Sequence, residues 1–242
     1  MATKPTIAGL EIEFDASLLG GTYSDGDTIT TGNDESGNAN HATGVNTPVY
    51  EATGWAPNAG GAARLLRADS DHFTFSGSSF IGTEMTWFAV AEVGDDGIII
   101  LSGYNTQTMR MLSLYVTPDG AVVAGFYDLA PGGPDNVTSA DGLANEGDFV
   151  VLSFRHDNTT GKILRLNGVE VAASHTGTDD LLGWNSPYIN RNNAEFWGDS
   201  RIAWISGYTT SASDAQIVDM EAYLNERFAL LPTLPPAIRW FM

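Results

Sequence analysis

Three acidic residues near the start of the chain have a spacing that suits acid-base chemistry. Glu11, Glu13 and Asp15 alternate with apolar residues, so in an extended strand all three side chains lie on one face. Two carboxylates about 5 to 5.5 Å apart can act as nucleophile and acid in a retaining glycoside hydrolase. The same alternation is typical of a half-buried strand with its apolar side chains facing inward and its acids facing solvent. We favour this second interpretation, because it accounts for every residue of the segment.

Acidic residues in predicted loops offer hard oxygen ligands for a calcium ion. The main candidates are Asp34, Asp69 and Asp71, since carboxylate and carbonyl oxygens are the ligands that Ca²⁺ takes. Further oxygen donors in the same or other loops are Glu35, Asn38, Asp95 and Asp96. No EF-hand spacing is present, and Asp69-Ser70-Asp71 equally suits a turn whose side chains accept backbone N–H groups. Calcium is therefore an open alternative, and no other cofactor is expected.

Four aromatic residues occur in predicted loops, next to Gly, Asn, Ser or Pro. They are Trp55, Tyr104, Trp184 and Tyr188. Exposed rings stack on the apolar face of a pyranose, while neighbouring Asn and Asp side chains bind its hydroxyls. The alternative is that these rings fill space beneath the loops, which large side chains commonly do. As a group they are our candidate glycan-binding residues.

Motifs for other chemistries are missing from the sequence. The chain has no cysteine, which excludes disulfides, thiolate zinc sites and cysteine nucleophiles. Its four histidines are scattered, and no zinc-hydrolase, serine-hydrolase or phosphate-binding motif occurs. Zinc, serine and nucleotide hydrolysis therefore have no motif support in the sequence.

Charge and composition narrow the choice of partners. Thirty acidic residues against 11 basic ones give a formal net charge of −19, and the only lysines are Lys4 and Lys162. Without a basic patch, neither nucleic acid nor an anionic membrane is an expected partner. No apolar run approaches the roughly 20 residues that span a bilayer. With 43% hydrophobic residues and six tryptophans, the chain is expected to fold.

Short apolar runs separated by turn residues predict an all-β protein. Residues 148–174 suit three consecutive antiparallel strands, the last two joined at Asn167-Gly168, a pair that favours a type I′ turn. A second hairpin is predicted around Thr117–Gly120. A third is predicted to pair residues 87–93 with 97–101 across Gly94-Asp95-Asp96-Gly97. The runs at 87–93 and 97–101 are continuously apolar, as strands covered on both faces would be.

One helix and one tail follow the strands. Ser213 and Gln216 form a capping box, and Ile217, Met220, Leu224 and Phe228 share one stripe, which predicts a helix from about 214 to 227. Residues 230–242 then form an apolar, proline-rich tail. In water its side chains Ile238, Trp240 and Phe241 would favour aggregation. We expect the tail either to pack on its own domain or to bind another subunit.

Several segments of the sequence, taken in order, resemble one known family. They are Gly9-Leu10 leading to Phe14–Ser17, Asn33–Thr43, Arg64–Leu66 with Asp71–Phe75, Trp87–Glu92, Leu164–Val171, Phe196–Ile205 and the closing helix. This set resembles laminin-G-like domains of the concanavalin A-like lectin/glucanase superfamily, of the phage and bacterial type. The resemblance implies a two-sheet antiparallel jelly roll over residues 1–229, with neighbouring termini and a short helix at one edge. Family members bind sugars, proteins or calcium, and most are not enzymes.

These observations favour a non-catalytic structural or binding module. Our first hypothesis is a bacteriophage virion protein, either a capsid decoration or a fibre component, that binds capsid or tail subunits or its own copies and has the capacity to bind glycans. Such a protein would be made in the cytoplasm without a signal peptide and lie on the virion surface. One alternative is a calcium-dependent secreted bacterial lectin. The other is a laminarinase-type hydrolase, although the order Glu-x-Glu-x-Asp here differs from the Glu-x-Asp-x-Glu of those enzymes.

Overall fold

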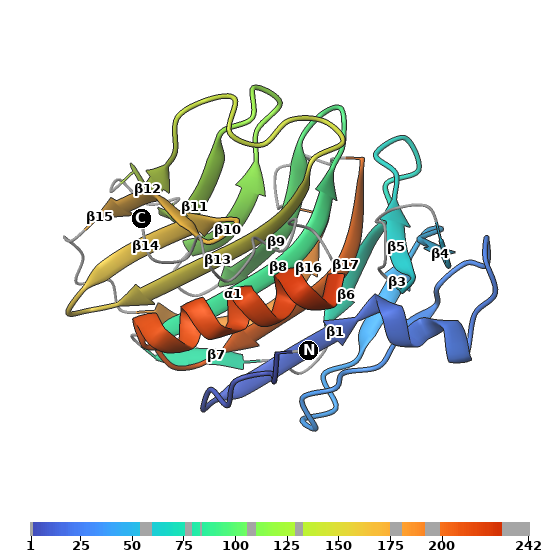
Figure 1. Ribbon diagram of the computed structural model, residues 1–242, viewed down its shortest axis with the longest axis horizontal. Coiled ribbons are helices and arrows are strands. Elements are labelled where there is room, and N and C mark those ends of the chain that lie inside the picture. Colours follow the sequence, from blue (N-terminus) through green and yellow to red (C-terminus); the bar gives the residue numbers. More distant parts are fainter. Residues whose placement is uncertain are drawn as a thin grey trace, which may run out of the picture.

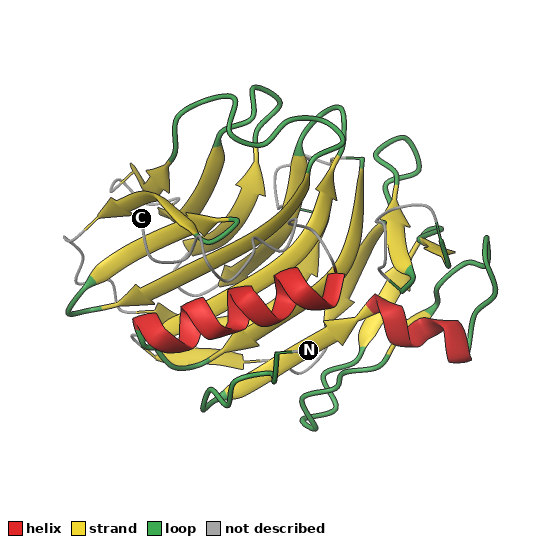
Figure 2. Ribbon diagram, viewed as in Figure 1, coloured by secondary structure: helices red, strands yellow, loops and turns green. Residues whose placement is uncertain are grey.

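The computed structural model describes residues 2–53, 60–75, 79–82, 84–105, 110–128, 133–174, 181–191 and 199–228. Within these ranges, side chains are described except at 79–82, 99, 104, 105, 110, 111, 127, 128, 133, 134 and 181–186. No helix in these ranges is long and apolar enough to cross a membrane. All strand pairs in both sheets run antiparallel (Figures 1 and 2).

The first sheet, called sheet A, carries the C-terminal helix on its outer face (Figure 1). Its spatial order is β15 (Val169–Ser174), β14 (Gly161–Leu166), β13 (Phe149–Asp157), β8 (Met85–Val93), β17 (Ser200–Tyr208), β5 (Ala62–Leu65) and β4 (Val49–Glu51). In addition, β1 (Leu10–Asp15) pairs with β17 and is followed by the short 3₁₀ helix η1 (Ala16–Gly21).

The second sheet, sheet B, forms the other layer of the sandwich. Its order is β12 (Gly133–Thr138), β11 (Val122–Asp128), β10 (Arg110–Val116), β9 (Ile98–Asn105), β16 (Leu181–Ile189), β6 (His72–Phe75), β3 (Ala42–Val45) and β2 (Thr31–Gly32). β7 (Ser79–Gly82) also pairs with β16. The predicted all-β, two-sheet antiparallel jelly-roll sandwich with one C-terminal helix is thus confirmed.

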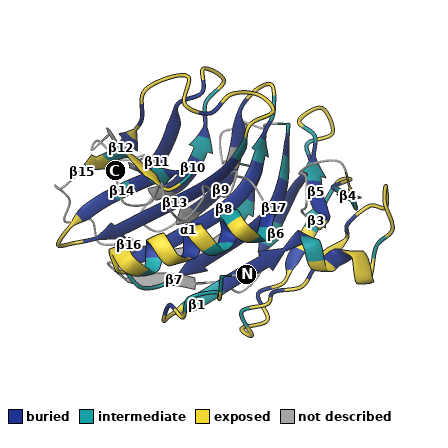
Figure 3. Ribbon diagram, in the orientation of Figure 1, coloured by how far each residue is buried: buried dark blue, intermediate teal, exposed yellow. Residues whose placement is uncertain are grey.

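Alternation along β8 explains how two apolar layers share one sheet. Trp87 and Ala89 face sheet B and join the core between the sheets, whereas Phe88 and Val90 face the opposite way and meet α1 (Asp214–Phe228). Seven consecutive side chains of β8, from Met85 to Ala91, are therefore buried. Figure 3 shows the same contrast, with dark blue central strands and a helix exposed on its outer side. The continuously apolar run at 87–93 was correctly interpreted as a strand covered on both faces.

The helix follows its sequence signals closely. It runs from Asp214 to Phe228, and the backbone N–H of Ser213 donates to Gln216 Oε1 at 2.9 Å, as a capping box requires. All four stripe residues are buried against sheet A. Burial of each such side chain stabilises the fold by about 1.5–3 kcal/mol. The helix therefore covers part of the outer face of sheet A.

Two of the three predicted hairpins are confirmed. Asn167 and Gly168 have φ values of 51° and 84°, as a type I′ turn needs. The N–H of Gly120 donates to the carbonyl of Thr117 at 2.9 Å, between β10 and β11.

The third predicted hairpin is wrong. A turn does form, with the Gly97 N–H donating to Gly94 O at 3.1 Å, but the strands on either side enter different sheets. Both edges of β8 are already paired, with β13 and with β17, so no edge is left for β9. The Gly94–Gly97 segment is therefore a corner that carries the chain from sheet A to sheet B.

Candidate functional site

The sequence interpretation placed all three N-terminal acids at the solvent face of their strand. The structure shows that this is wrong for two of them. Glu13 and Asp15 are buried, because the N-terminal segment and α1 cover their face of β1. Lys4 Nζ contacts Glu13 at 2.5 Å, and Trp204 Nε1 donates to Glu13 Oε1 at 3.2 Å. Asp15 accepts the N–H of Ser17 and pairs with Arg227 of α1. Both carboxylates thus hold the fold together, and neither is free at a surface to attack a substrate.

The candidate metal ligands occupy separate places around β3. Asp34 follows β2 and Asp71 precedes β6, next to opposite ends of β3, while Asp69 is exposed. Among the described residues, no group of three or more His, Cys, Asp or Glu side chains could hold a metal ion. The calcium hypothesis stays a prediction.

The two buried aspartates, Asp34 and Asp71, accept hydrogen bonds from backbone N–H groups. Asp71 accepts the N–H of Thr47 at 2.8 Å and that of Leu66 at 3.2 Å. Asp34 accepts the N–H groups of Glu13 and Asn40, each at 2.9 Å. Burial opposes the charge of Asp34, but these bonds and those from Ser36 together hold its pKa below the usual value.

The loop around Asp34 also closes the free edge of β1. Ser36 Oγ donates to Glu11 O at 3.0 Å, Asn38 Nδ2 to Leu10 O at 2.8 Å, and Asn40 Nδ2 to Glu11 O at 2.9 Å. Together with the backbone N–H of Glu35, which donates to Glu13 O at 2.8 Å, these side chains replace the neighbouring strand that would otherwise satisfy this edge.

The candidate aromatic residues are in strands where the structure describes them, so their placement in loops was wrong. Tyr104 belongs to β9, one residue before its end, and Trp184 and Tyr188 belong to β16, which the sequence analysis missed. Register places Tyr188 opposite Ser102 and Asn185 opposite Tyr104, so the three aromatics share two neighbouring strands. The Tyr188 ring lies 5.2 Å from the Arg191 guanidinium.

Several predicted residues lie wholly or partly outside the described parts. These are Trp55, the side chains of Tyr104 and Trp184, and the tail residues Ile238, Trp240 and Phe241.

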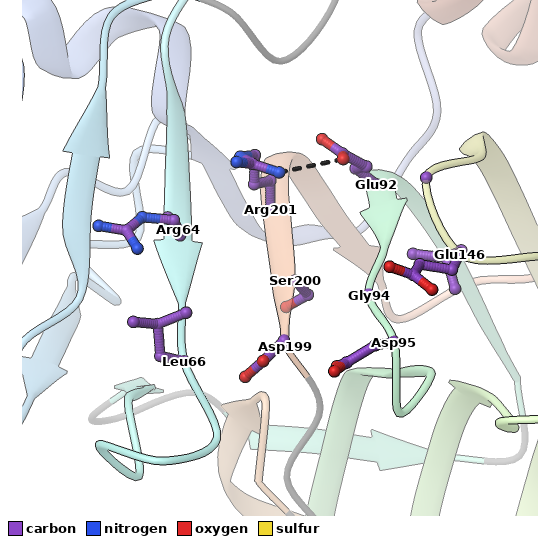
Figure 4. A pocket seen from close by; sticks show the side chains of 11 residues that line it. Arg64, Leu66, Glu92, Gly94, Asp95, Glu146, Asp199, Ser200 and Arg201 are labelled. Carbon is purple, nitrogen blue, oxygen red and sulfur yellow. Dashed lines mark hydrogen bonds and ion pairs between the residues drawn. The ribbon is translucent and has the colours of Figure 1, made fainter.

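A polar pocket of about 330 Å³ opens in sheet A, where β5 and β8 end and β17 begins (Figure 4). This volume is at the lower end of the roughly 300–1,000 Å³ that is usual for small-molecule sites. Its lining consists of Arg64, Leu66, Glu92, Val93, Gly94, Asp95, Glu146, Gly147, Asp199, Ser200 and Arg201.

A row of charges crosses the strands beside this pocket. Arg201 lies directly opposite Arg64 on β5 and Glu92 on β8. Two like charges face to face would destabilise the sheet. Glu51 of β4 removes the conflict, because its two oxygens contact the Nε atoms of Arg64 at 2.7 Å and of Arg201 at 2.5 Å. Arg201 also reaches Glu92 Oε1 at 3.0 Å, so the guanidinium of Arg201 is held in place from both sides.

One oxygen atom of the charge row, Glu92 Oε2, is buried and has no hydrogen-bond partner in the described structure. Ser200 Oγ also has none, but Ser200 pairs with Leu65 and Val93 and so faces the core between the sheets. Burial raises the pKa of Glu92 above its ordinary value, although the ion pair with Arg201 opposes this shift. Because unsatisfied buried polar atoms are costly, such atoms beside a pocket mark it as a place for a hydrogen-bonding ligand.

Backbone contacts hold the pocket walls. A Cβ atom on Gly94 would lie 1.5 Å from the carbonyl oxygen of Asp199, so only glycine allows β8 and the start of β17 to approach this closely. The N–H of Gly147 donates to Val93 O at 2.8 Å, which fixes the loop that carries Glu146.

Sequence reasoning missed this pocket. Its lining residues come from four separate segments that only the order of strands in sheet A brings together. One signal was available, since Glu92 and Arg201 are charged residues within otherwise apolar strands.

Comparison with known proteins gives structural matches alone. No family model and no curated protein sequence matches the chain. One similar structure is domain 4 of AbnA, a GH43 extracellular arabinanase from Geobacillus stearothermophilus, in complex with arabinotriose. It has a TM-score of 0.59 and 16% identity, over 88% of this chain and 98% of that one.

Two further matches are parts of longer chains. The botulinum neurotoxin serotype G binding domain has a TM-score of 0.63 and 9% identity, over 89% of this chain and 51% of that one. Trypanosoma rangeli sialidase, solved with 2,3-difluorosialic acid, has a TM-score of 0.54 and 12% identity, over 93% of this chain and 34% of that one. At these identities the likeness establishes the fold: a two-sheet antiparallel sandwich of the kind found in lectin-like domains.

Proposed function

We propose that the protein is a non-catalytic glycan-binding module whose saccharide site is the pocket of sheet A. The observation that carries this proposal is a polar pocket of suitable size in which Arg201 is held in place and Glu92 Oε2 has no hydrogen-bond partner. The fold supports it, since the similar arabinanase domain was solved with arabinotriose bound.

The pocket offers the groups that sugar hydroxyls need. Carboxylate oxygens accept hydroxyl protons, and guanidinium N–H groups donate. Glu51 and Glu92 hold Arg201 in position before any ligand arrives, which lowers the entropy cost of binding.

A glycan array followed by calorimetry tests this function. Loss of a partner for a charged hydrogen bond costs about 1.5–3 kcal/mol, so Glu92→Gln is expected to weaken binding at least tenfold. Ser200→Ala is expected to leave it unchanged, because Ser200 faces the core between the sheets. Glu170→Gln is the matched control, because Glu170 is an exposed acid on β15, at the far end of sheet A. Absence of glycan binding by the unmodified protein, or equal affinity in all variants, would refute the proposal.

The same preparations test the enzyme alternative. With Glu13 and Asp15 engaged beneath α1, we expect no release of reducing sugar from laminarin. Hydrolysis that Glu13→Gln abolishes would instead support a glycosidase.

We further propose that the module is a virion protein of the laminin-G-like type, displayed on a particle surface. Its charge of −19 supports this role, because a strongly acidic surface stays soluble and avoids the packaged nucleic acid. Light scattering tests the assembly that such a role requires. A strictly monomeric protein that does not bind capsid or tail proteins would contradict it.

A further inference from the structure

One edge of the sandwich brings strands of both sheets together. β14 and β15 end sheet A there, β12 ends sheet B, and the two sides are in contact (Figure 1). On β13 and β14, Phe154 and Leu164 face sheet B and belong to the core between the sheets. By alternation, His156 and Lys162 lie on the same face, two residues nearer the turn that joins these strands. Two basic side chains are therefore placed between the sheets.

Both basic side chains are fully buried. His156 and Lys162 are each 0% exposed, and they lie directly opposite each other on neighbouring strands. Residues paired in this way have Cβ atoms about 4.5–5.5 Å apart. Both also contact Phe126 of β11, whose ring centroid lies 5.0 Å from that of His156 and 5.3 Å from Lys162 Nζ. An imidazole and an ammonium group thus share one apolar space.

A carboxylate of the other sheet balances the ammonium group. Lys162 Nζ pairs with Asp135 of β12, which lies opposite Phe126 in the register of sheet B. The Asp135 side chain is 45% exposed, so the pair joins the buried space to the surface and sheet A to sheet B. While His156 is neutral, the positive charge of Lys162 and the negative charge of Asp135 cancel.

The remaining neighbours of His156 with described side chains bring no charge into this space. Met85 of β8 is opposite His156 on its second side, and Ser174 of β15 is opposite Lys162. Asp157 follows His156 in the chain, so its side chain lies on the other face of β13. The charge of the space therefore depends on whether His156 is protonated.

Protonation of His156 would upset the balance. It would place a second positive charge, shielded from water, opposite the ammonium group of Lys162, and like charges directly opposite each other destabilise a sheet. In the unfolded chain a histidine takes up its proton at about pH 6.5 without this cost. The stabilisation is thus complete above about pH 6.5 and is lost as pH falls, because the unfolded state then binds more protons.

We propose that His156 and Lys162 form an acid-sensitive switch between the two sheets. At neutral pH the imidazole is uncharged, and the pair of Lys162 and Asp135 holds the edge closed. In acid, two positive charges oppose one carboxylate, and β12 separates from β14 and β15. The switch does not rest on the glycan-binding function, since none of these residues lines the pocket.

Nuclear magnetic resonance titration of the histidine rings tests the repulsion. Lys162→Met removes the ammonium group, and we expect His156 to take up its proton at a pH about one unit or more higher in this variant than in the unmodified protein. Lys4→Met is the matched control, because it removes the same charge from the only other lysine, which pairs with Glu13. An unchanged His156 titration in Lys162→Met, or equal changes in both variants, would overturn the proposal.

Hydrogen exchange then locates the opening. Between pH 7.5 and 5, exchange in residues 133–138 and 161–174 should increase about tenfold more in the unmodified protein than in His156→Gln, since one pKa unit is a tenfold change in the equilibrium. Residues 200–208, in the middle of sheet A, should show no such difference. Equal increases in both proteins at 133–138 and 161–174 would rule the switch out.

The local measurement is needed because His72 is buried as well, so the pH dependence of overall stability does not by itself identify His156. Circular dichroism at pH 7.5 confirms that each variant is folded. If His156→Gln is not folded, the comparison of Lys162→Met with Lys4→Met decides the question.

Discussion

The outer face of sheet A has two regions on the same two strands, one covered by α1 and the other open at a pocket. On β8 and β17, Val90 and Trp204 are buried beneath α1 in an apolar cluster. Only two residues along β8, Glu92 pairs with Arg201 on the same face and lines an open pocket. The strand backbone is continuous through both regions. Their difference teaches that the helix determines which part of the sheet becomes core and which part stays open at a pocket.

The strongest test removes a contact in the covered region. Leu224→Ala leaves a cavity between α1 and sheet A, and should lower the free energy of unfolding by about 2–5 kcal/mol in urea. Val218→Ala on the same helix is the control, because Val218 is 51% exposed and its loss should change stability by no more than about 0.5 kcal/mol. If the comparison holds, glycan affinity is the same in both variants wherever they are folded.

The next test disturbs the corner beside the uncovered region. Gly94→Ala forces the new methyl group against the Asp199 carbonyl, and we expect a loss of about 1–3 kcal/mol in stability together with loss of glycan binding. Gly21→Ala is the control, since nothing lies within 4 Å of a Cβ at that position. Normal binding by Gly94→Ala would show that the pocket walls tolerate movement.

A smaller effect is expected from the charge row. Glu51→Gln removes the carboxylate that keeps Arg64 and Arg201 apart electrostatically, and should cost about 1 kcal/mol because these side chains are partly exposed. Adding Arg64→Gln should restore part of the loss, because it removes the repulsion. Strictly additive losses in urea unfolding would contradict this account of the row.

The smallest effects are differences in pH dependence. Burial opposes the charge of Asp157, but hydrogen bonds from Thr160, Thr159 and Ser211 lower its pKa to about 2. Its contribution is therefore complete above the ordinary value of 3.8, and is lost as pH falls toward about 2. Glu92 behaves oppositely, since burial raises its pKa and protonation at low pH relieves the cost.

Urea unfolding at several pH values measures both contributions. The stability of the unmodified protein relative to Asp157→Asn should fall as the medium becomes acidic, whereas its stability relative to Glu92→Gln should rise. Slopes of the same sign would contradict the proposed difference between the two regions.

Much of the fold was predictable because its signals are local. A capping box, a four-residue apolar stripe and an Asn-Gly turn each act within a few residues, and each gave the observed helix or hairpin. The turn at Gly94–Gly97 was also local, but whether its strands pair depends on β13 and β17, which lie far along the chain. The burial of Asp15 likewise depends on Arg227 of α1, and that of Glu13 on Trp204 of β17, each about 200 residues later.

The candidate site could not be predicted for the same reason. Glu92, Glu146 and Arg201 become neighbours only when β8 pairs with β17 and the 146–147 loop bonds to Val93. The aromatic residues were identified by type, but their strand β16 was not, since its irregular register with β9 and β7 weakens any alternating pattern.

The pairing of β1 with β17 has a consequence for how the molecule is made. A ribosome releases residues 10–15 long before residues 200–208 exist, so the first strand must wait for almost the whole chain before it finds its place. Contacts of such long sequence separation slow folding. During that wait, the 34–40 loop, which leaves the ribosome soon after β1, can already cover one edge of the strand. The 34–40 loop thus protects one edge of β1 from pairing with a wrong strand during synthesis.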